Sequence, residues 1–434
     1  MTAGVLGGTA LVLAGAFTGL AILGDLAARA RSFVSLFAVA GGAYALAATW
    51  VVRRPPTGRT ALAAIIGAAV VFRLVLLPTP PSLSTDVYRY LWDGRLQAAG
   101  VSPYAFPPDA PALAAYRDTV VYPRLNHRAW RTVYPPGAQL IFATMAWLAP
   151  ASVLAFKALI VAADLATLLC LVGWLGALGQ PRAWVLLYAW HPLVVVELAG
   201  TGHLDAVVLL TSVLALWAAT RGREGWAGAW VGVGALVKLY PLLLLPAVWR
   251  RRPGRALVAC LAVVGVGYGL YAREGAAVLG SLPRFLAEEE FNGTLRVALE
   301  WLAGPFGEPG RLAVRAAPLI ALAGLAAAVG WAGRPVPPAR RAFWLVAAYL
   351  VATPSLFPWY ALWLVPLLAV APRWPWLWLT GAVALTYLVF AEPVWRIPGW
   401  VRLAEFGPLA LGVAWAGRLR VRSPRGVASL EVSR

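Results

Sequence analysis

The chain has 434 residues, of which 61% are hydrophobic and only 13% are charged. A soluble domain of this length needs more charged surface, so the composition excludes an ordinary soluble enzyme and indicates a protein with many membrane-spanning helices. The formal net charge is +19. The basic residues gather in short links between apolar runs, which is typical of cytoplasmic membrane loops and argues against a nucleic-acid partner.

Apolar runs of helical length follow one another along the whole chain. Because a span needs about 20 residues, we expect about fourteen such segments, several of them short, at 4–23, 33–52, 60–77, 135–149, 152–175, 183–198, 203–220, 226–249, 254–271, 311–332, 340–353, 357–371, 374–391 and 401–417. The first run has no basic region before it, so we interpret it as a span rather than a cleaved signal. The short pair 183–198 and 203–220 could instead form half-spans that enter the membrane and return.

Four basic links predict the orientation in the membrane. They share closely spaced arginines and are Arg53, Arg54 and Arg59; Arg250, Arg251, Arg252 and Arg255; Arg334, Arg340 and Arg341; and Arg418, Arg420, Arg422 and Arg425. Such links face the cytoplasm, so we expect both termini and the tail 418–434 there, and the long loops 78–134 and 272–310 on the opposite side. The chain would then be one polytopic transmembrane domain, 1–434.

The first long loop carries a dense group of charges directly after an apolar run. Residues 84–104 read S-T-D-V-Y-R-Y-L-W-D-G-R-L-Q-A-A-G-V-S-P-Y, and helical spacing puts Asp86, Arg89 and Asp93 on one face. Arg89 and Arg95 suit bidentate contacts with a phosphate or pyrophosphate. The alternative is an amphipathic helix in which these residues form ion pairs worth about 0.3–0.5 kcal/mol each.

Asp86 is the candidate catalytic residue. It lies where a span meets the external face, and a carboxylate there can take a proton from an acceptor hydroxyl during sugar transfer. Aromatic residues alternate with arginines in the rest of this loop, which predicts short interfacial helices, including one near 112–118.

Lys238 lies deep in the apolar run 226–249, in the sequence A-L-V-K-L-Y-P. A cation at mid-bilayer costs about 2.5–3.5 kcal/mol on insertion scales, so Lys238 should face a cavity or a counter-ion, for which a lipid phosphate is suited. Tyr240 and Pro241 should kink the helix just after it. The alternative is that Lys238 extends its ammonium group to the membrane surface.

The link G-T-G-H-L-D, 200–205, precedes another apolar run and offers His203 and Asp205. The alternative to a binding role is a hydrogen-bonded histidine and an aspartate that caps the next helix. The chain has only three histidines and no H-x-x-x-H spacing, so we expect no zinc site.

The sequence T-P-S-L-F-P-W-Y, which ends at Trp359 and Tyr360, begins a span on the external side. These two rings could stack on a sugar. The alternative is a belt of interfacial aromatic residues.

Taken together, these motifs resemble the membrane-embedded glycosyltransferases of the C-type superfamily. In family order they are T-D-V-Y-R-Y-L-W-D-G-R with G-V-S-P-Y, then Y-P-P-G-A-Q-L and G-T-G-H-L-D-A, then V-K-L-Y-P-L-L-L-L-P, and last P-W-Y-A-L-W-L-V-P. The nearest named patterns are those of glycosyltransferase family 87, bacterial mannosyltransferase-like proteins, and of the GPI mannosyltransferase I catalytic subunit. The resemblance covers roughly residues 80–370.

The resemblance implies an all-α membrane helix bundle in a bacterial plasma membrane that moves a hexose, expected to be mannose, from a polyprenyl phosphate to a lipid- or glycan-linked acceptor. Transfer would be external, and a single displacement would make it inverting. We expect no cofactor and assign no residue to a metal, and metal dependence is left open. Asp86 matches the family base, Lys238 and Tyr240 match its K-x-Y-P motif, and Trp359 with Tyr360 match its W-Y motif. The family often has paired acids in its first loop, whereas the residue before Asp86 in this chain is not an acid. The chain also has Thr-Gly-His where many members of the GPI branch have Arg-Gly-Asn.

Two other functional classes remain as alternatives at this stage. In a transporter or lipid-linked-sugar flippase, Lys238 and Glu197 would be charges along the pathway, and inverted repeats would be expected. In an inactive scaffold subunit, the purified chain would show no transfer. The sequence contains no P-loop, G-x-G-x-x-G, G-x-S-x-G or H-E-x-x-H motif, so ATP-driven transport and hydrolase chemistry have no support.

Overall fold

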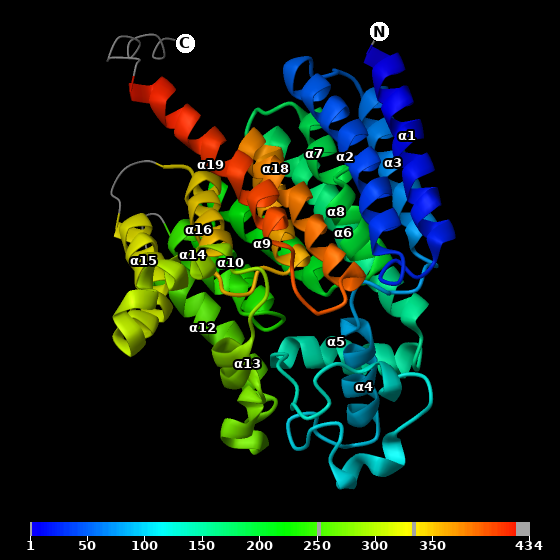
Figure 1. The fold of residues 1–434 in the computed structure, drawn as a ribbon, viewed down its shortest axis with the longest axis vertical. Coiled ribbons are helices and arrows are strands. Elements are labelled where there is room, and N and C mark those ends of the chain that lie inside the picture. Colours follow the sequence, from blue (N-terminus) through cyan, green and yellow to red (C-terminus); the bar gives the residue numbers. More distant parts are fainter. Residues whose placement is uncertain (1, 250–252, 332–335, 422–434) are drawn as a thin grey trace.

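The computed structural model describes residues 2–249, 253–331 and 336–421. Within these ranges the chain is helical, with no strand, as expected for a polytopic helical membrane protein (Figure 1). Five helices are long and apolar enough to cross a membrane, or up to seven if each of two bent pairs is one span. The expected run of separate spans is therefore largely replaced by shorter and bent helices.

The α-helices cover most of the apolar runs and parts of both long loops. In chain order they are α1 (Thr2–Leu23), α2 (Ala30–Arg53), α3 (Arg59–Leu76), α4 (Asp86–Ala98), α5 (Pro136–Leu148), α6 (Val153–Ala177), α7 (Leu186–Ala189), α8 (Pro192–Val194), α9 (Asp205–Thr220), α10 (Glu224–Ala235), α11 (Leu245–Val248), α12 (Pro253–Gly269), α13 (Leu282–Glu288), α14 (Thr294–Ala303), α15 (Gly307–Trp331), α16 (Pro338–Ala352), α17 (Val365–Val370), α18 (Trp374–Ala382) and α19 (Gly399–Val421).

Short 3-10 and π-helical segments join or extend these helices. They are η1 (Pro111–Tyr116), η2 (Tyr122–Arg124), η3 (Arg182–Val185), the π-helical η4 (Val195–Gly200), η5 (Tyr240–Leu244), η6 (Ala272–Leu279), η7 (Gly304–Phe306), η8 (Pro358–Leu364) and η9 (Val383–Ala391). Segment η1 is the short helix expected near 112–118.

A buried ion pair joins the N-terminal helices to the centre of the bundle. Helix α1 packs on α2 and α3, and Arg73 of α3 reaches Asp164 of α6 with 2.5 Å between Nε and Oδ2. Neither side chain is exposed, and the Tyr188 hydroxyl donates a further hydrogen bond to Asp164 at 2.6 Å. A buried pair of this kind needs such added hydrogen bonds to offset its loss of hydration.

The run 226–249, which we expected to form one span, is broken in the structure. Helix α10 ends at Ala235, residues 236–239 are not helical, and the chain resumes as η5 and α11. Pro241 and Pro246 lie at the starts of these two short helices, where proline is tolerated because its missing N–H would have had no partner. Lys238 therefore lies in the break rather than inside a helix.

The run 183–198 does not form one straight helix, and its pairing with 203–220 as two half-spans stays a prediction. The segments 182–189 and 192–200 form a pair bent by 57°. Residues 201–204 then connect the π-helical η4 to α9, so the G-T-G-H link is a turn inside the bundle with buried residues on either side.

The two long loops lie at the same end of the molecule. Figure 1 shows α4, α5 and α13 at one end, while the first turn of α1 and the last turns of α19 are at the other. The termini and the loops thus lie at opposite ends of the molecule, and the side of the membrane that each end faces stays a prediction. Part of the predicted cytoplasmic tail, residues 422–434, lies outside the described residues.

Candidate active site

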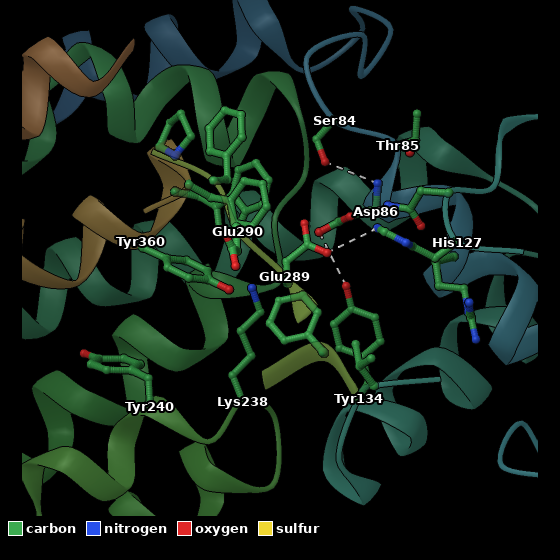
Figure 2. A pocket seen from close by; sticks show the side chains of 18 of the residues that line it. Ser84, Thr85, Asp86, His127, Tyr134, Lys238, Tyr240, Glu289, Glu290 and Tyr360 are labelled. Atoms are coloured by element: carbon green, nitrogen blue, oxygen red, sulfur yellow. Dashed lines mark hydrogen bonds and ion pairs between the residues drawn. The ribbon is translucent and has the colours of Figure 1, made fainter. Parts of the chain in front are cut away.

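A cavity of about 800 Å³ lies where the two long loops meet the broken helices. Its lining comes from the start of α4, the end of the first loop, the break after α10, the second loop and η8. Figure 2 shows its polar side chains, with Asp86 and Tyr134 opposite Lys238 and Tyr360 and with Glu289 between them. Segments more than 270 residues apart in the chain thus contribute to one site.

Asp86 is the first residue of α4 and its carboxylate lines the cavity. The Asn126 amide donates a hydrogen bond to its Oδ1 at 3.1 Å, and the Tyr134 hydroxyl donates one to its Oδ2 at 3.4 Å. The backbone N–H of Asp86 is bonded to the Ser84 hydroxyl at 3.3 Å. The Asp86 side chain is 18% exposed, so its carboxylate remains accessible to a substrate while these neutral donors orient it.

His203 lies behind Asp86 and is almost completely buried. Its Nδ1 is 3.7 Å from Asp86 Oδ2, and its Nε2 is 3.3 Å from Glu197 Oε2. Its ring stacks on Trp359, with 4.0 Å between centroids. The Tyr387 hydroxyl donates to the other oxygen of Glu197 at 2.7 Å. The turn therefore places His203 between two carboxylates, which helical spacing in the sequence did not indicate.

Lys238 also lines the cavity and has the counter-ion that its position requires. Its Nζ lies 2.5 Å from Asp205 Oδ2, and the Trp363 indole donates to Asp205 Oδ1 at 2.7 Å. Asp205 is completely buried, whereas the Lys238 side chain remains 15% exposed. The lysine is thus held at the edge of the cavity, where an anionic group can approach it.

The charges on α4 divide between the cavity and the loop interior. Arg89 lines the cavity, and its Nε pairs with Asp93 Oδ1 at 2.9 Å. Asp93 is buried and also accepts a hydrogen bond from the Gln139 amide at 3.0 Å. This is the ion pair of the amphipathic-helix alternative, and it leaves Arg89 at the cavity wall while Asp93 lies behind it.

Arg95 is not among the residues that line the cavity. Its guanidinium pairs with Asp118 and donates to the carbonyl of Tyr116, because it points from α4 toward the end of η1. Partial burial tends to raise the pKa of Asp118, but hydrogen bonds from three backbone amides and from Arg95 outweigh it and lower the pKa below 3.8. Arg95 therefore organises the first loop.

Two ring stacks form one wall of the cavity. Tyr240 stacks on Trp363 at 3.9 Å and Trp363 on Tyr360 at 4.6 Å between centroids. Trp359 stacks on Phe357 at 4.7 Å, in line with His203 on its other face. All of these except His203 line the cavity, so the aromatic residues expected to contact a sugar are present as a preorganised surface.

Glu289 is a cavity residue that the sequence interpretation did not select as a site residue. It follows α13 in the second loop, in the run E-E-E-F-N. Burial raises the pKa of its carboxyl above 4.5, His127 opposes this, and the negative charge of Asp86 raises it further. Three consecutive acids in the second loop were the available signal, but the sequence did not indicate that Glu289 and Glu290 line the cavity while Glu288 does not.

Over the described ranges, no group of three or more His, Cys, Asp or Glu side chains is arranged to hold a metal ion.

The match to a known protein family was found over residues 132–358, slightly more than half of the chain. The matching model is that of glycosyltransferase family 87. The chain belongs to glycosyltransferase family 87. The matched segment contains His203, Lys238 and Glu289 and ends one residue before Trp359, and the fold adds Asp86 to the same cavity.

Comparison with curated proteins found no match, and comparison with solved structures found none either. Family 87 membership and the apolar helices identify a multi-pass membrane glycosyltransferase. The family supports a transferase over the transporter or flippase alternative. A sugar donor and an acceptor are thus its expected partners.

Proposed function

We propose that this family 87 enzyme transfers a hexose, mannose by resemblance, from a polyprenyl phosphate to a lipid- or glycan-linked acceptor outside the cytoplasm. The observation that carries the proposal is that Asp86 and Lys238 line the same cavity, one a candidate base and the other a candidate phosphate ligand. The family membership supports the transferase class. The identity of the donor, the identity of the sugar and the side of the membrane on which transfer occurs are all parts of this proposal.

The lipid part of the donor needs an apolar path to the phosphate-binding end of the site. Apolar side chains from four parts of the chain line the cavity, and they include Leu243, Leu282, Phe285, Leu286, Leu322 and Val389. Leu286 is 68% exposed, so the apolar lining continues to the protein surface. A prenyl chain would cover such a surface from the membrane side.

The transfer itself requires one bond to form and one to break. Asp86 would take the proton of the acceptor hydroxyl as its oxygen attacks the anomeric carbon. The bond from that carbon to the phosphate oxygen would break on the opposite face, so the anomeric centre is inverted. The lipid phosphate would leave with both bonding electrons, and Lys238 would stabilise its charge, with Arg89 as a second cation in the cavity lining.

Replacing the candidate base tests this proposal. Asp86→Asn, assayed in membranes with labelled polyprenyl-phosphate mannose, should lose roughly 100- to 10,000-fold in transfer rate. Asp109→Asn is the matched control, because Asp109 is an exposed aspartate of the same loop that does not line the cavity. Full transfer by Asp86→Asn would exclude Asp86 as the base. Uptake of label into sealed vesicles by the wild type, with no transfer, would contradict the proposed function.

A further inference from the structure

Three consecutive glutamates of the second loop have different environments. Glu288 pairs with Arg284 at 2.9 Å and Glu290 with Arg296 at 2.6 Å. Glu289 lies between them, and its carboxylate has no arginine or lysine partner among the described residues. The Nε2 atom of His127 lies 3.9 Å from its Oε2 atom. The Glu289 side chain is only 18% exposed and lines the cavity. Glu290 also lines the cavity, but Arg296 neutralises its charge, so Glu289 is the one acid of the three that lines the cavity without an arginine partner among the described residues.

Adjacent residues of the first loop hold Glu289 and Asp86. Asn126 donates to Asp86, and the next residue, His127, contacts Glu289. His127 has a φ of +43°, a backbone conformation that is unfavourable for a residue with a Cβ atom. Its ring also packs against Trp130 in a tilted arrangement, with 4.6 Å between centroids. This strained turn directs two neighbouring side chains toward two carboxylates from different loops.

Both carboxylates face the same part of the cavity. Figure 2 shows Asp86 and Glu289 extending from opposite loops into the space above the Tyr134 ring. The negative charge of Asp86 also contributes to raising the pKa of Glu289, as expected for neighbouring acids. Trp359 and Phe357 supply a flat aromatic surface in the same lining.

This arrangement has the chemistry of a polyol site. A carboxylate accepts hydrogen bonds from hydroxyl groups, and the aromatic surface packs against the C–H face of a sugar ring. Two carboxylates repel a phosphate, so Glu289 is unsuited to the leaving group of the donor. Two acids on separate loops match two hydroxyls on one ring better than they match a single alcohol.

We propose that the acceptor is a sugar residue that presents two adjacent hydroxyl groups, the reacting one to Asp86 and its neighbour to Glu289. This inference rests on the proposed transfer reaction and names its acceptor class. Glu289 is then a specificity residue that contacts the acceptor, and the His127 turn positions it. A simple lipid alcohol would leave Glu289 without a hydrogen-bond donor in the site.

The test measures acceptor discrimination. Octyl α-mannoside and its monodeoxy analogues serve as acceptors, with labelled polyprenyl-phosphate mannose as donor. In the wild type, removal of the hydroxyl beside the reacting one should lower kcat/KM roughly 10- to 100-fold, as expected for a lost hydrogen bond to a charged group. Glu289→Gln should transfer more slowly to octyl α-mannoside, so its kcat/KM for this parent acceptor should approach that for the deoxy analogue and most of the discrimination should be lost. Glu289→Asp, which keeps the charge, should retain part of it.

Glu288→Gln is the matched control, because this acid is paired at the surface and does not line the cavity. It should discriminate like the wild type. Unchanged discrimination in Glu289→Gln, or equal transfer by the wild type to octanol and to octyl α-mannoside, would overturn the inference while leaving the proposed transfer intact. Absence of any transfer from the polyprenyl donor to total membrane lipid or to the mannosides would instead overturn the proposed function.

Discussion

Lys238 and Asp205 form an ion pair in which Nζ lies 2.5 Å from Oδ2, and only the lysine reaches the cavity. The aspartate is fixed from the other side by the Trp363 indole. The pair therefore has two separable roles, since it satisfies a buried carboxylate and it holds an ammonium group for a phosphate. Variants that remove one role without the other can distinguish them.

We predict that Lys238→Met lowers both stability and transfer. Loss of the lysine leaves Asp205 buried without its counter-ion, which costs about 3–5 kcal/mol. In Lys238→Met/Asp205→Asn the buried charge is gone, so thermal stability in detergent should recover, whereas transfer should stay roughly 100- to 1,000-fold below wild type because the phosphate ligand is missing. Recovery of transfer together with stability would show that the lysine has only a structural role.

For the Arg73–Asp164 pair we expect changes in stability without a loss of transfer, unlike the Lys238–Asp205 pair. Both side chains are fully buried and neither lines the cavity. Arg73→Met should cost about 3–5 kcal/mol in unfolding free energy, and Arg73→Met/Asp164→Leu should recover most of it. Transfer per folded molecule should remain near wild type in both variants. A loss of transfer in the stable double variant would contradict a purely structural assignment.

Gly202 is predicted to be intolerant of a side chain for two reasons. Its φ is +78°, and an added Cβ would lie 2.8 Å from Cγ of Lys157, which is itself buried. Gly202→Ala should therefore lower stability by about 1–3 kcal/mol and displace His203. We expect roughly a 10-fold loss of transfer, the cost of a misplaced site residue.

Gly179→Ala is the control for Gly202→Ala. Gly179 has a φ of +66° but nothing within 4 Å of an added Cβ. Gly179→Ala should lose a similar unfolding free energy through its backbone conformation, and its transfer rate should remain normal. Equal transfer rates in the two variants, measured per folded molecule, would disprove the role of the Gly202–Lys157 contact in positioning His203.

Glu289 should make stability depend on pH. Burial, together with Asp86, raises the pKa of its carboxyl above 4.5, so the folded state binds this proton more tightly than the unfolded state. Wild-type stability should therefore fall as the pH rises from 4.5 through the raised pKa. Relative to wild type, Glu289→Gln should gain thermal stability over that interval and keep the gain at higher pH. A difference between the two proteins that is independent of pH would contradict this.

Sequence patterns predicted several local features of the site. Asp86 was selected because it begins a charged helix after an apolar run, and α4 does begin there. Lys238 was selected because a cation in an apolar run needs a partner, and Asp205 is that partner. The alternatives for Arg89 and Asp93 included the ion pair that the structure contains. These features follow from helical spacing and the cost of burying charge, which are local properties.

The sequence alone determined that this is an all-helical membrane protein, because a chain with so many long apolar runs satisfies its backbone hydrogen bonds in a bilayer by forming helices. It also determined which few polar residues are costly to bury. Only the tertiary structure decided that Arg95 turns to Asp118, that His203 lies between Asp86 and Glu197, and that Glu289 faces the cavity. Some of these contacts join segments far apart in the chain, such as His203 with Asp86, and others join residues of one loop, such as Arg95 with Asp118. Their geometry depends on tertiary packing that no periodicity along one segment specifies.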